Sequence, residues 1–279
     1  MVAGKKAVEE EEGYKMEIRV LEQNKDGMKL ALLIKESSPS FMNTLRRTIM
    51  EEVPTMAIEE VEIQKNNSIL YDEMIAHRLG LVPLTTDLKG YELPPQYDNT
   101  AELSAKHYCT LVLSTKGPCT VYASDLKSKD PAVKPVYPKM PIVKLLKGQS
   151  LELEAKAMLG TGSIHAKWVP GLAHYKYKPV IEIGNVEHPE KIVEAMHGNV
   201  FEIKNGKLDI IKENLFKYDF AGVLEDASDG KVKLKRDNDF IFTLESWGQL
   251  SCKEIFNAAF DTMNEAYDKL AEEIKASEK

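Results

Sequence analysis

The side chains that could do chemistry are spaced too widely in this sequence to form a recognisable active site. No G-x-S-x-G segment offers a serine nucleophile. The histidines show neither H-x-x-x-H nor H-E-x-x-H spacing, which metal-binding helices use; they are His77, His107, His165, His174, His188 and His197. We therefore expect no catalytic residue and no metal ligand in this chain.

The cysteines and the most glycine-rich segment also lack a motif spacing. Cys109, Cys119 and Cys252 are far apart and form no C-x-x-C, so neither a zinc ribbon nor an iron–sulfur cluster is expected, and free thiols in a reducing compartment explain them. Residues 160–168 lack the G-x-x-x-x-G-K-[ST] spacing of a phosphate loop. His165 and Lys167 are candidate functional residues there, although a solvated loop is the simpler interpretation.

Composition favours a soluble globular protein. The 279 residues are 43% hydrophobic and 29% charged, and no apolar run approaches the roughly 20 residues that span a membrane. The net charge of −7, without a dense basic segment, argues against direct nucleic-acid binding as the main role. Residues 1–13 lack the apolar centre of a signal peptide. We expect them to be a disordered lead, and the protein to be cytoplasmic.

Two hairpins and several strands can be read from the pattern. Alternation over Met16–Leu21 and Met28–Ile34, around the turn residues 24–27, predicts a β-hairpin, and Asn205-Gly206 predicts a second one over residues 201–211. Segments 108–114 and 120–123 read as strands, and segments 142–146 and 151–155 read as a further strand pair around Gly148-Gln149. Short strands are also expected at Val180–Ile183 and Phe240–Leu244.

The helices are predicted from apolar spacing and capping residues. Phe41, Leu45 and Ile49 recur every four residues after a Ser38 cap, and further helices are expected near residues 72–81, 189–196 and 215–224. The last helix begins with a Ser251–Glu254 capping box. Its apolar positions alternate in steps of four and three, as a coiled-coil seam does; they are Phe256, Phe260, Met263, Tyr267, Leu270 and Ile274. Such a seam fits an internal core or a partner helix, and its length at a chain end favours a partner.

Two arginines lie in the first helix among large apolar groups. Arg46 and Arg47 either extend their charged ends to water along the helix surface or bind another chain. The pattern alone leaves both interpretations open.

Three separated blocks resemble one family. Asn43-Thr44-Leu45-Arg46-Arg47, Glu52-Val53-Pro54-Thr55-Met56-Ala57-Ile58 and the segment from Asp72 to Leu84 closely resemble the D-subunit family of archaeal DNA-directed RNA polymerase, which is related to the bacterial α N-terminal domain and the third-largest subunit of eukaryotic polymerase II. His165-Ala166-Lys167-Trp168, Phe242–Trp247 and the last helix look like further family segments.

The resemblance implies an α+β fold with a discontinuous dimerisation domain, built from residues 14–56 and 235–279 as an antiparallel sheet with two long helices. Residues 57–167 would form a mostly β insert domain, and residues 168–236 a small ferredoxin-like insert. The helix residues Phe41, Leu45 and Ile49, with the seam of the last helix, would then line the dimer interface. Arg46 and Arg47 become candidate contacts to a large subunit.

The resemblance also implies a function. Members of this family pair with the small subunit L, and the pair is the platform on which small subunits N and P and the large catalytic subunits assemble. The chain would then be part of a nucleotidyltransferase complex without catalytic residues of its own.

The sequence departs from some members of the family in the second insert. In those members this insert holds iron–sulfur clusters, but residues 215–224 contain no cysteine here. We expect a ferredoxin-like insert without a cluster, filled by apolar side chains. A redox protein and a separate enzyme on the same scaffold are the alternative functions. The cysteine count disfavours the first, and no motif supports the second.

Overall fold

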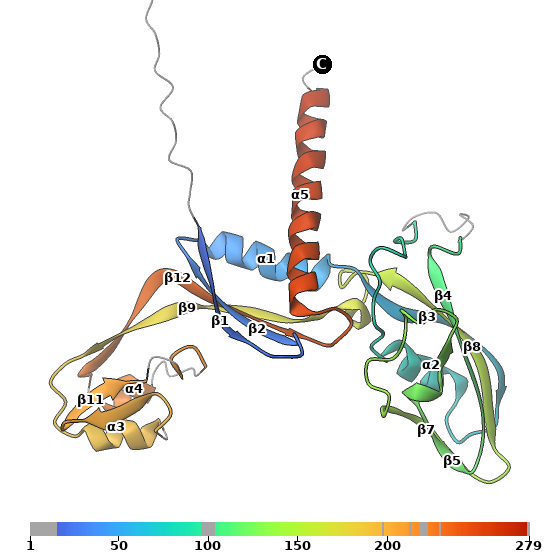
Figure 1. Cartoon of the computed structure of the whole chain (residues 1–279), viewed down its shortest axis with the longest axis horizontal. Helices are drawn as coiled ribbons and strands as arrows, with labels where there is room; N and C mark the ends of the chain where they lie inside the picture. The colour runs from blue at the N-terminus through green and yellow to red at the C-terminus, as the bar shows by residue number, and fades with distance from the viewer. Residues whose placement is uncertain are drawn as a thin grey trace, which may run out of the picture. The chain divides into compact units, whose positions relative to one another are not determined.

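The computed structural model describes residues 16–95, 104–196, 198–211, 214–217, 223–228 and 230–277 of this chain. The predicted disordered lead, residues 1–13, lies outside these residues. The described part combines helices with antiparallel sheets, as the predicted α+β class requires (Figure 1).

The elements follow one another as Figure 1 labels them. The helices are α1 (Pro39–Glu51), α2 (Asp72–Gly80), α3 (Pro189–Ala195), α4 (Val223–Ala227) and α5 (Cys252–Ser277). The strands are β1 (Glu17–Gln23), β2 (Lys29–Lys35), β3 (Thr55–Asn66), β4 (Tyr108–Lys116), β5 (Cys119–Tyr122), β6 (Lys127–Ser128), β7 (Pro141–Leu145), β8 (Ser150–Gly160), β9 (Gly171–Ile183), β10 (Phe201–Lys204), β11 (Lys207–Ile210) and β12 (Val232–Ser246).

Segments from both ends of the sequence meet in one sheet, whose strand order is β1-β2-β12-β9. The predicted first hairpin supplies β1 and β2, and the Asn24 amide donates to the Lys29 carbonyl at 3.0 Å across its turn. After β12, the Cys252 amide donates to the Gly27 carbonyl at 2.9 Å, which fixes the start of α5 beside this turn. Strands β9 and β12 are much longer than the short segments that the sequence predicted.

The chain divides into two compact units, each continuous in space but not in sequence. One holds the described residues of 1–21, 32–42 and 175–242, and the other holds the described residues of 22–31, 43–174 and 243–279. The boundary between the units runs through several strands and through α1.

The larger unit contains a β module with its own core. The sheet order is β3-β8-β4-β6, and β5 and β7 form a separate two-stranded sheet. Apolar side chains from both sheets and from α2 pack together and are almost fully buried; among them are Ile58, Ile75, Leu79, Leu111, Val121, Leu145 and Leu153. The predicted pairing of β7 with β8 is wrong, because β7 pairs with β5 while β8 lies between β3 and β4.

The smaller unit has a second core around the predicted hairpin of β10 and β11. Asn205 and Gly206 both have positive φ, at 52° and 73°, as a two-residue hairpin turn requires. Ile192, Val200, Phe201 and Val232 are buried in this core. The predicted helix over residues 215–224 is wrong at its start, because residues 214–217 form a turn and α4 begins at Val223. Residues 218–222 lie outside the described part.

Helix α1 begins where the sequence predicted, with the Phe41 amide donating to the Ser38 hydroxyl at 3.2 Å. Its end is completed from far along the chain, because the Ser163 amide donates to the Glu51 carbonyl at 2.9 Å. A side chain at Gly162 would collide with the Met50 carbonyl oxygen, so only glycine allows this approach.

Candidate interaction surface

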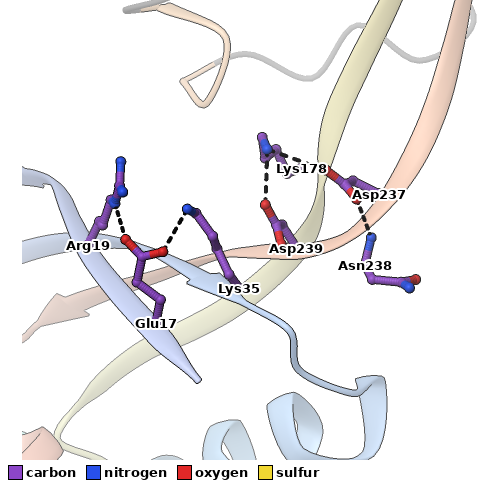
Figure 2. A network of polar contacts seen from close by, with 7 residues as sticks. All are labelled: Glu17, Arg19, Lys35, Lys178, Asp237, Asn238 and Asp239. Atoms are coloured by element: carbon purple, nitrogen blue, oxygen red, sulfur yellow. Dashed lines mark hydrogen bonds and ion pairs between the residues drawn. The ribbon is translucent and has the colours of Figure 1, made fainter. Parts of the chain in front are cut away.

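The acidic residues of β12 include a D-x-D spacing that sequence reasoning missed. Asp237 and Asp239 flank Asn238, and both carboxylates bind the Lys178 ammonium of β9, at 3.3 and 2.9 Å (Figure 2). Hydrogen bonding to Asp239 raises the pKa of Lys178. The two aspartates therefore link β12 to β9 through Lys178. Their carboxylates are engaged by this lysine and are not a free pair for a metal ion.

A similar ion pair joins the first two strands. Glu17 of β1 accepts a hydrogen bond from the Lys35 ammonium of β2 at 2.7 Å and also binds Arg19, and hydrogen bonding to Lys35 lowers the pKa of Glu17 (Figure 2). Within the described residues, no group of three or more histidine, cysteine, aspartate or glutamate side chains is gathered as a metal site would need. None of the helices in this part of the chain combines the length and apolarity needed to cross a bilayer.

Helix α5 starts from a capping box, and one face of its first half is buried. The Ser251 amide donates to the Glu254 carboxylate at 2.8 Å, and the Glu254 amide donates to the Ser251 hydroxyl at 3.3 Å. The Glu254 carboxylate also accepts a hydrogen bond from the Ser251 hydroxyl at 2.6 Å, and this bond first, then the one from the Ser251 amide, lowers the pKa of Glu254. Of the predicted seam, Phe256 and Met263 are buried inside the chain and Phe260 is half-buried. Half of the predicted seam therefore belongs to the internal core.

The second half of α5 has no packing neighbour in the described part of this chain. Every residue from 264 to 277 is exposed, so about four turns of the helix extend without side-chain packing against the described part of this chain. Along one side the apolar stripe continues, with Tyr267, Leu270 and Ile274 exposed by 61%, 54% and 51%. A helix of this length with an uncovered apolar stripe is typical of a surface that another protein covers.

The predicted interface residues of α1 are placed differently. Leu45 and Ile49 are buried inside the chain, with exposed fractions of 1% and 0%, and Phe41 is half-buried. These residues can support an interface from beneath, but Leu45 and Ile49 offer almost no surface to a partner. Their role in a dimer interface stays a prediction.

Arg46 and Arg47 both make contacts along their own helix. The Arg46 guanidinium donates to the Asn43 amide oxygen at 3.0 and 3.1 Å, and Arg47 donates to the Glu51 carboxylate at 2.9 and 3.2 Å. Hydrogen bonding to Arg47 lowers the pKa of Glu51. Arg47 is exposed while Arg46 is half-buried, so Arg47 is the more available of the two to another chain.

Lys167 is not the solvated residue that the sequence predicted. Its side chain is only 12% exposed, its ammonium donates to the Ile58 carbonyl at 2.9 Å and binds the Glu59 carboxylate, and it lies 4.3 Å above the centre of the Trp168 ring. A β-bulge in β3 between Ile58 and Glu60 leaves Glu59 outside the ladder and turns it towards this lysine. The interpretation as a solvated loop is wrong for Lys167, although His165 is exposed.

These residues border an open groove with a volume of about 440 Å³. Its walls come from β3, from α2 and from the segment that precedes β9, and they include His77, Leu81, Ile164 and His165. Trp168 forms part of the floor, and its indole N–H donates to the Met158 carbonyl at 3.2 Å. No spacing in the sequence signals this groove, because its residues lie in three segments that only the fold brings together.

Comparisons with known proteins agree with the family blocks in the sequence. Residues 61–170 match the family model described as the RNA polymerase Rpb3/RpoA insert domain. The chain is 37% identical over 263 residues to DNA-directed RNA polymerase subunit Rpo3 of Pyrococcus furiosus, covering 93% of this chain and 97% of the relative. It is 37% identical over 268 residues to the Rpo3 subunit of Methanosphaera stadtmanae, covering 92% and 98%. The Rpo3 subunit of Pyrobaculum aerophilum is 37% identical over 255 residues, covering 88% and 91%.

Proposed function

We propose, because this chain belongs to the Rpo3 family of DNA-directed RNA polymerase subunits, that it is a non-catalytic assembly subunit of that enzyme. In this proposal it pairs with the small subunit L in the cytoplasm. The pair then serves as the platform for small subunits N and P and for the large catalytic subunits. Phosphoryl transfer and its magnesium site belong to the large subunits, and DNA contact is not the main role of this chain.

The exposed half of α5 is the observation that carries the proposal. Full burial of Tyr267, Leu270 and Ile274 under a partner would contribute roughly 1.5–3 kcal/mol for each large apolar side chain, before the entropic cost of association. Charges of both signs flank the stripe, because Glu273 and Lys275 lie about 100° to either side of Ile274 on the helix, while Glu265, Lys269 and Glu272 lie on the opposite face. An apolar stripe with a charged border is the anatomy of a specific interface.

The large subunits are proposed to contact α1 through its arginines. Arg47 is exposed and holds a planar guanidinium, which suits a carboxylate of another chain better than a lysine would. Its contact with Glu51 spans one helical turn on the surface, where such an ion pair contributes little to stability, so a partner carboxylate can replace it at little cost. We expect Arg47→Ala to leave pairing with L intact and to weaken recruitment of a large subunit. Unchanged recruitment would favour the interpretation as a surface arginine.

The second insert is proposed to hold no iron–sulfur cluster. Its residues do not fit one, because all three cysteines of the chain lie outside residues 168–236 and cluster iron is held mainly by cysteine thiolates. Apolar side chains such as Ile192, Phe201 and Val232 occupy its core. Iron and sulfide analysis of anaerobically purified protein tests this proposal, and stoichiometric iron with sulfide would refute it.

Coexpression with a subunit L partner tests the central proposal. We expect the pair to copurify and Leu270→Asp to abolish pairing, because the change places a carboxylate in a desolvated stripe. Ile164→Asp is the matched control, since Ile164 is equally exposed at 55% but does not belong to α5, and it should pair as the wild type does. Phe260→Asp should also abolish pairing. If the Leu270 and Phe260 variants both pair normally, the stripe faces something other than L.

A further inference from the structure

Three loops of the β module meet at one end of it, where β3 ends and β8 begins (Figure 1). They are residues 66–71, 116–118 and 145–150. The Ser150 amide donates to the Asn67 side-chain oxygen at 2.6 Å, which joins the first loop to the third. The Gly117 amide donates to the Gln149 carbonyl at 2.8 Å, which joins the second to the third. We call this end of the module the three-loop tip.

The three-loop tip exposes three large apolar side chains, and hydrogen bonds hold the backbone of the first loop that carries two of them. Ile69, Tyr71 and Leu146 are exposed by 80%, 76% and 58%. The Asn66 side-chain amide donates to the Leu70 carbonyl at 2.8 Å, and the Ser68 amide donates to the Asn66 side-chain oxygen at 3.0 Å. These bonds hold the first loop in one conformation.

Buried neighbours alternate with the exposed residues. Leu70 and Leu145 pack on the core of the module, so Ile69 and Leu146 must point away from it. A side chain at Gly117 would collide with the Leu146 carbonyl oxygen, which shows how closely the second and third loops approach. An apolar surface that is held ready in this way loses little entropy when a partner covers it.

Positive charge borders this surface on the side of the second and third loops, although the whole chain carries a net charge of −7 and the exposed Asp72 and Glu73 follow Tyr71. Lys116, Lys144 and Lys147 are exposed on the second and third loops and on β7 next to them. Among the ion pairs that the described residues form, none includes these three lysines. Asp72, which follows the first loop, accepts a hydrogen bond from the Asn66 amide at 2.7 Å.

We propose that the three-loop tip binds an acidic polypeptide segment that carries a large apolar side chain. The apolar side chain would cover Ile69, Tyr71 and Leu146, and its acidic neighbours would approach the three lysines. Tyrosine is enriched at the centres of protein interfaces, and complementary charge speeds and orients the encounter. A single-stranded nucleic acid fits less well, because its bases need aromatic platforms and the tip offers one tyrosine beside two aliphatic side chains.

Fluorescence anisotropy with the full chain tests this proposal. The probes are two labelled twelve-residue peptides that share one Leu-Phe centre, flanked by glutamates in one and by lysines in the other. We expect the acidic peptide to bind about tenfold more tightly than the basic one, and to weaken as salt rises. Ile69→Ser with Tyr71→Ser should weaken acidic-peptide binding about tenfold or more. Lys144→Glu with Lys147→Glu should reverse the preference between the two peptides.

Matched controls lie elsewhere on the same module. Ile164→Ser removes an apolar side chain that is 55% exposed, and Lys139→Glu reverses an exposed charge, so both should bind the acidic peptide as the wild type does. Circular dichroism and urea unfolding show whether each variant remains folded. Equal binding of the two peptides, unchanged binding by the tip variants, or binding of a single-stranded RNA in place of the acidic peptide would each overturn the proposal.

Discussion

The two halves of α5 share one sequence pattern but meet different surroundings. Over residues 252–263 the apolar positions are covered by the chain itself, and Ile255 and Ala259 are fully buried. Over residues 264–277 the same spacing continues, yet every residue is exposed. The apolar pattern therefore indicates which face of the helix is covered, but it does not indicate whether this chain or another one covers that face.

This difference also separates stability from assembly along one helix. Changes in the first half should act on the lone chain, since its side chains fill the internal core. Changes in the second half should leave the lone chain nearly unaffected and act only when a partner is present.

The largest effect is expected from shortening a side chain in the buried half of α5. Ile255→Ala should lower the free energy of unfolding of the lone chain by about 2–5 kcal/mol, because it leaves a cavity in the core. Leu270→Ala should change it by less than about 0.5 kcal/mol, as exposed substitutions do. Urea unfolding at low protein concentration measures both. Similar losses in the two variants would mean that the second half of α5 also packs on its own chain.

Thiol reactivity gives the next comparison. Burial raises the pKa of the Cys252 thiol and shields it, so Cys252 should react slowly with an aromatic disulfide reagent in the lone chain and in the complex. Ala271→Cys, in a background with Cys119→Ser, places a thiol on the exposed stripe. This thiol should react about 100-fold faster than Cys252 in the lone chain, and it should slow markedly once subunit L binds. Fast reaction in the complex would place the interface elsewhere.

The capping box at the start of α5 should contribute a smaller amount to the free energy of unfolding. Ser251→Ala removes the hydroxyl that accepts from the Glu254 amide and should lower the free energy of unfolding by about 1 kcal/mol. Ser277→Ala is the control at the other end of α5, where the serine hydroxyl donates to the Ile274 carbonyl in the exposed last turn, and it should have almost no effect. A loss as large in the control would show that the effect does not come from the capping box, because alanine favours a helix more than serine does.

The smallest effect is a pH dependence from Glu254. Its pKa is lowered in the folded chain from the usual carboxyl value of 4.5, so its stabilising contribution is fully present above pH 4.5. The contribution is lost as the pH falls through the lowered pKa of the folded chain. Glu254→Gln should remove this loss, so the stability difference between wild type and variant should shrink below pH 4.5. Parallel unfolding curves at pH 7 and at pH 3.5 measure it, and a constant difference would contradict it.

Features that depend on neighbouring residues were predicted well from the sequence. Asn205-Gly206 specifies a hairpin turn by itself, and the Ser251–Glu254 capping box needs only four residues. Ser38 likewise marks the start of α1. In each case the partner atoms lie within a few positions, so the local sequence contains the whole interaction.

Features that depend on distant residues could not be predicted in this way. The segments around Gly148-Gln149 look like a hairpin, yet β8 finds better partners in β3 and β4, which lie far away in sequence. Lys167 looks solvated until the bulge at Glu59 and the ring of Trp168 are brought to it. The division of α5 into a covered and an uncovered half depends on what the rest of the chain places beside it, and no local pattern records that.

The completed end of α1 has a consequence for the order in which the protein forms on the ribosome. The Glu51 carbonyl receives its hydrogen bond from Ser163, about 110 residues later in the chain. At roughly 5–20 residues per second, a growing chain would wait on the order of ten seconds for this residue. During that interval the last turn of α1 is open to water. The first helix to be synthesised is therefore not the first to be finished, and the β module must be made before α1 is complete.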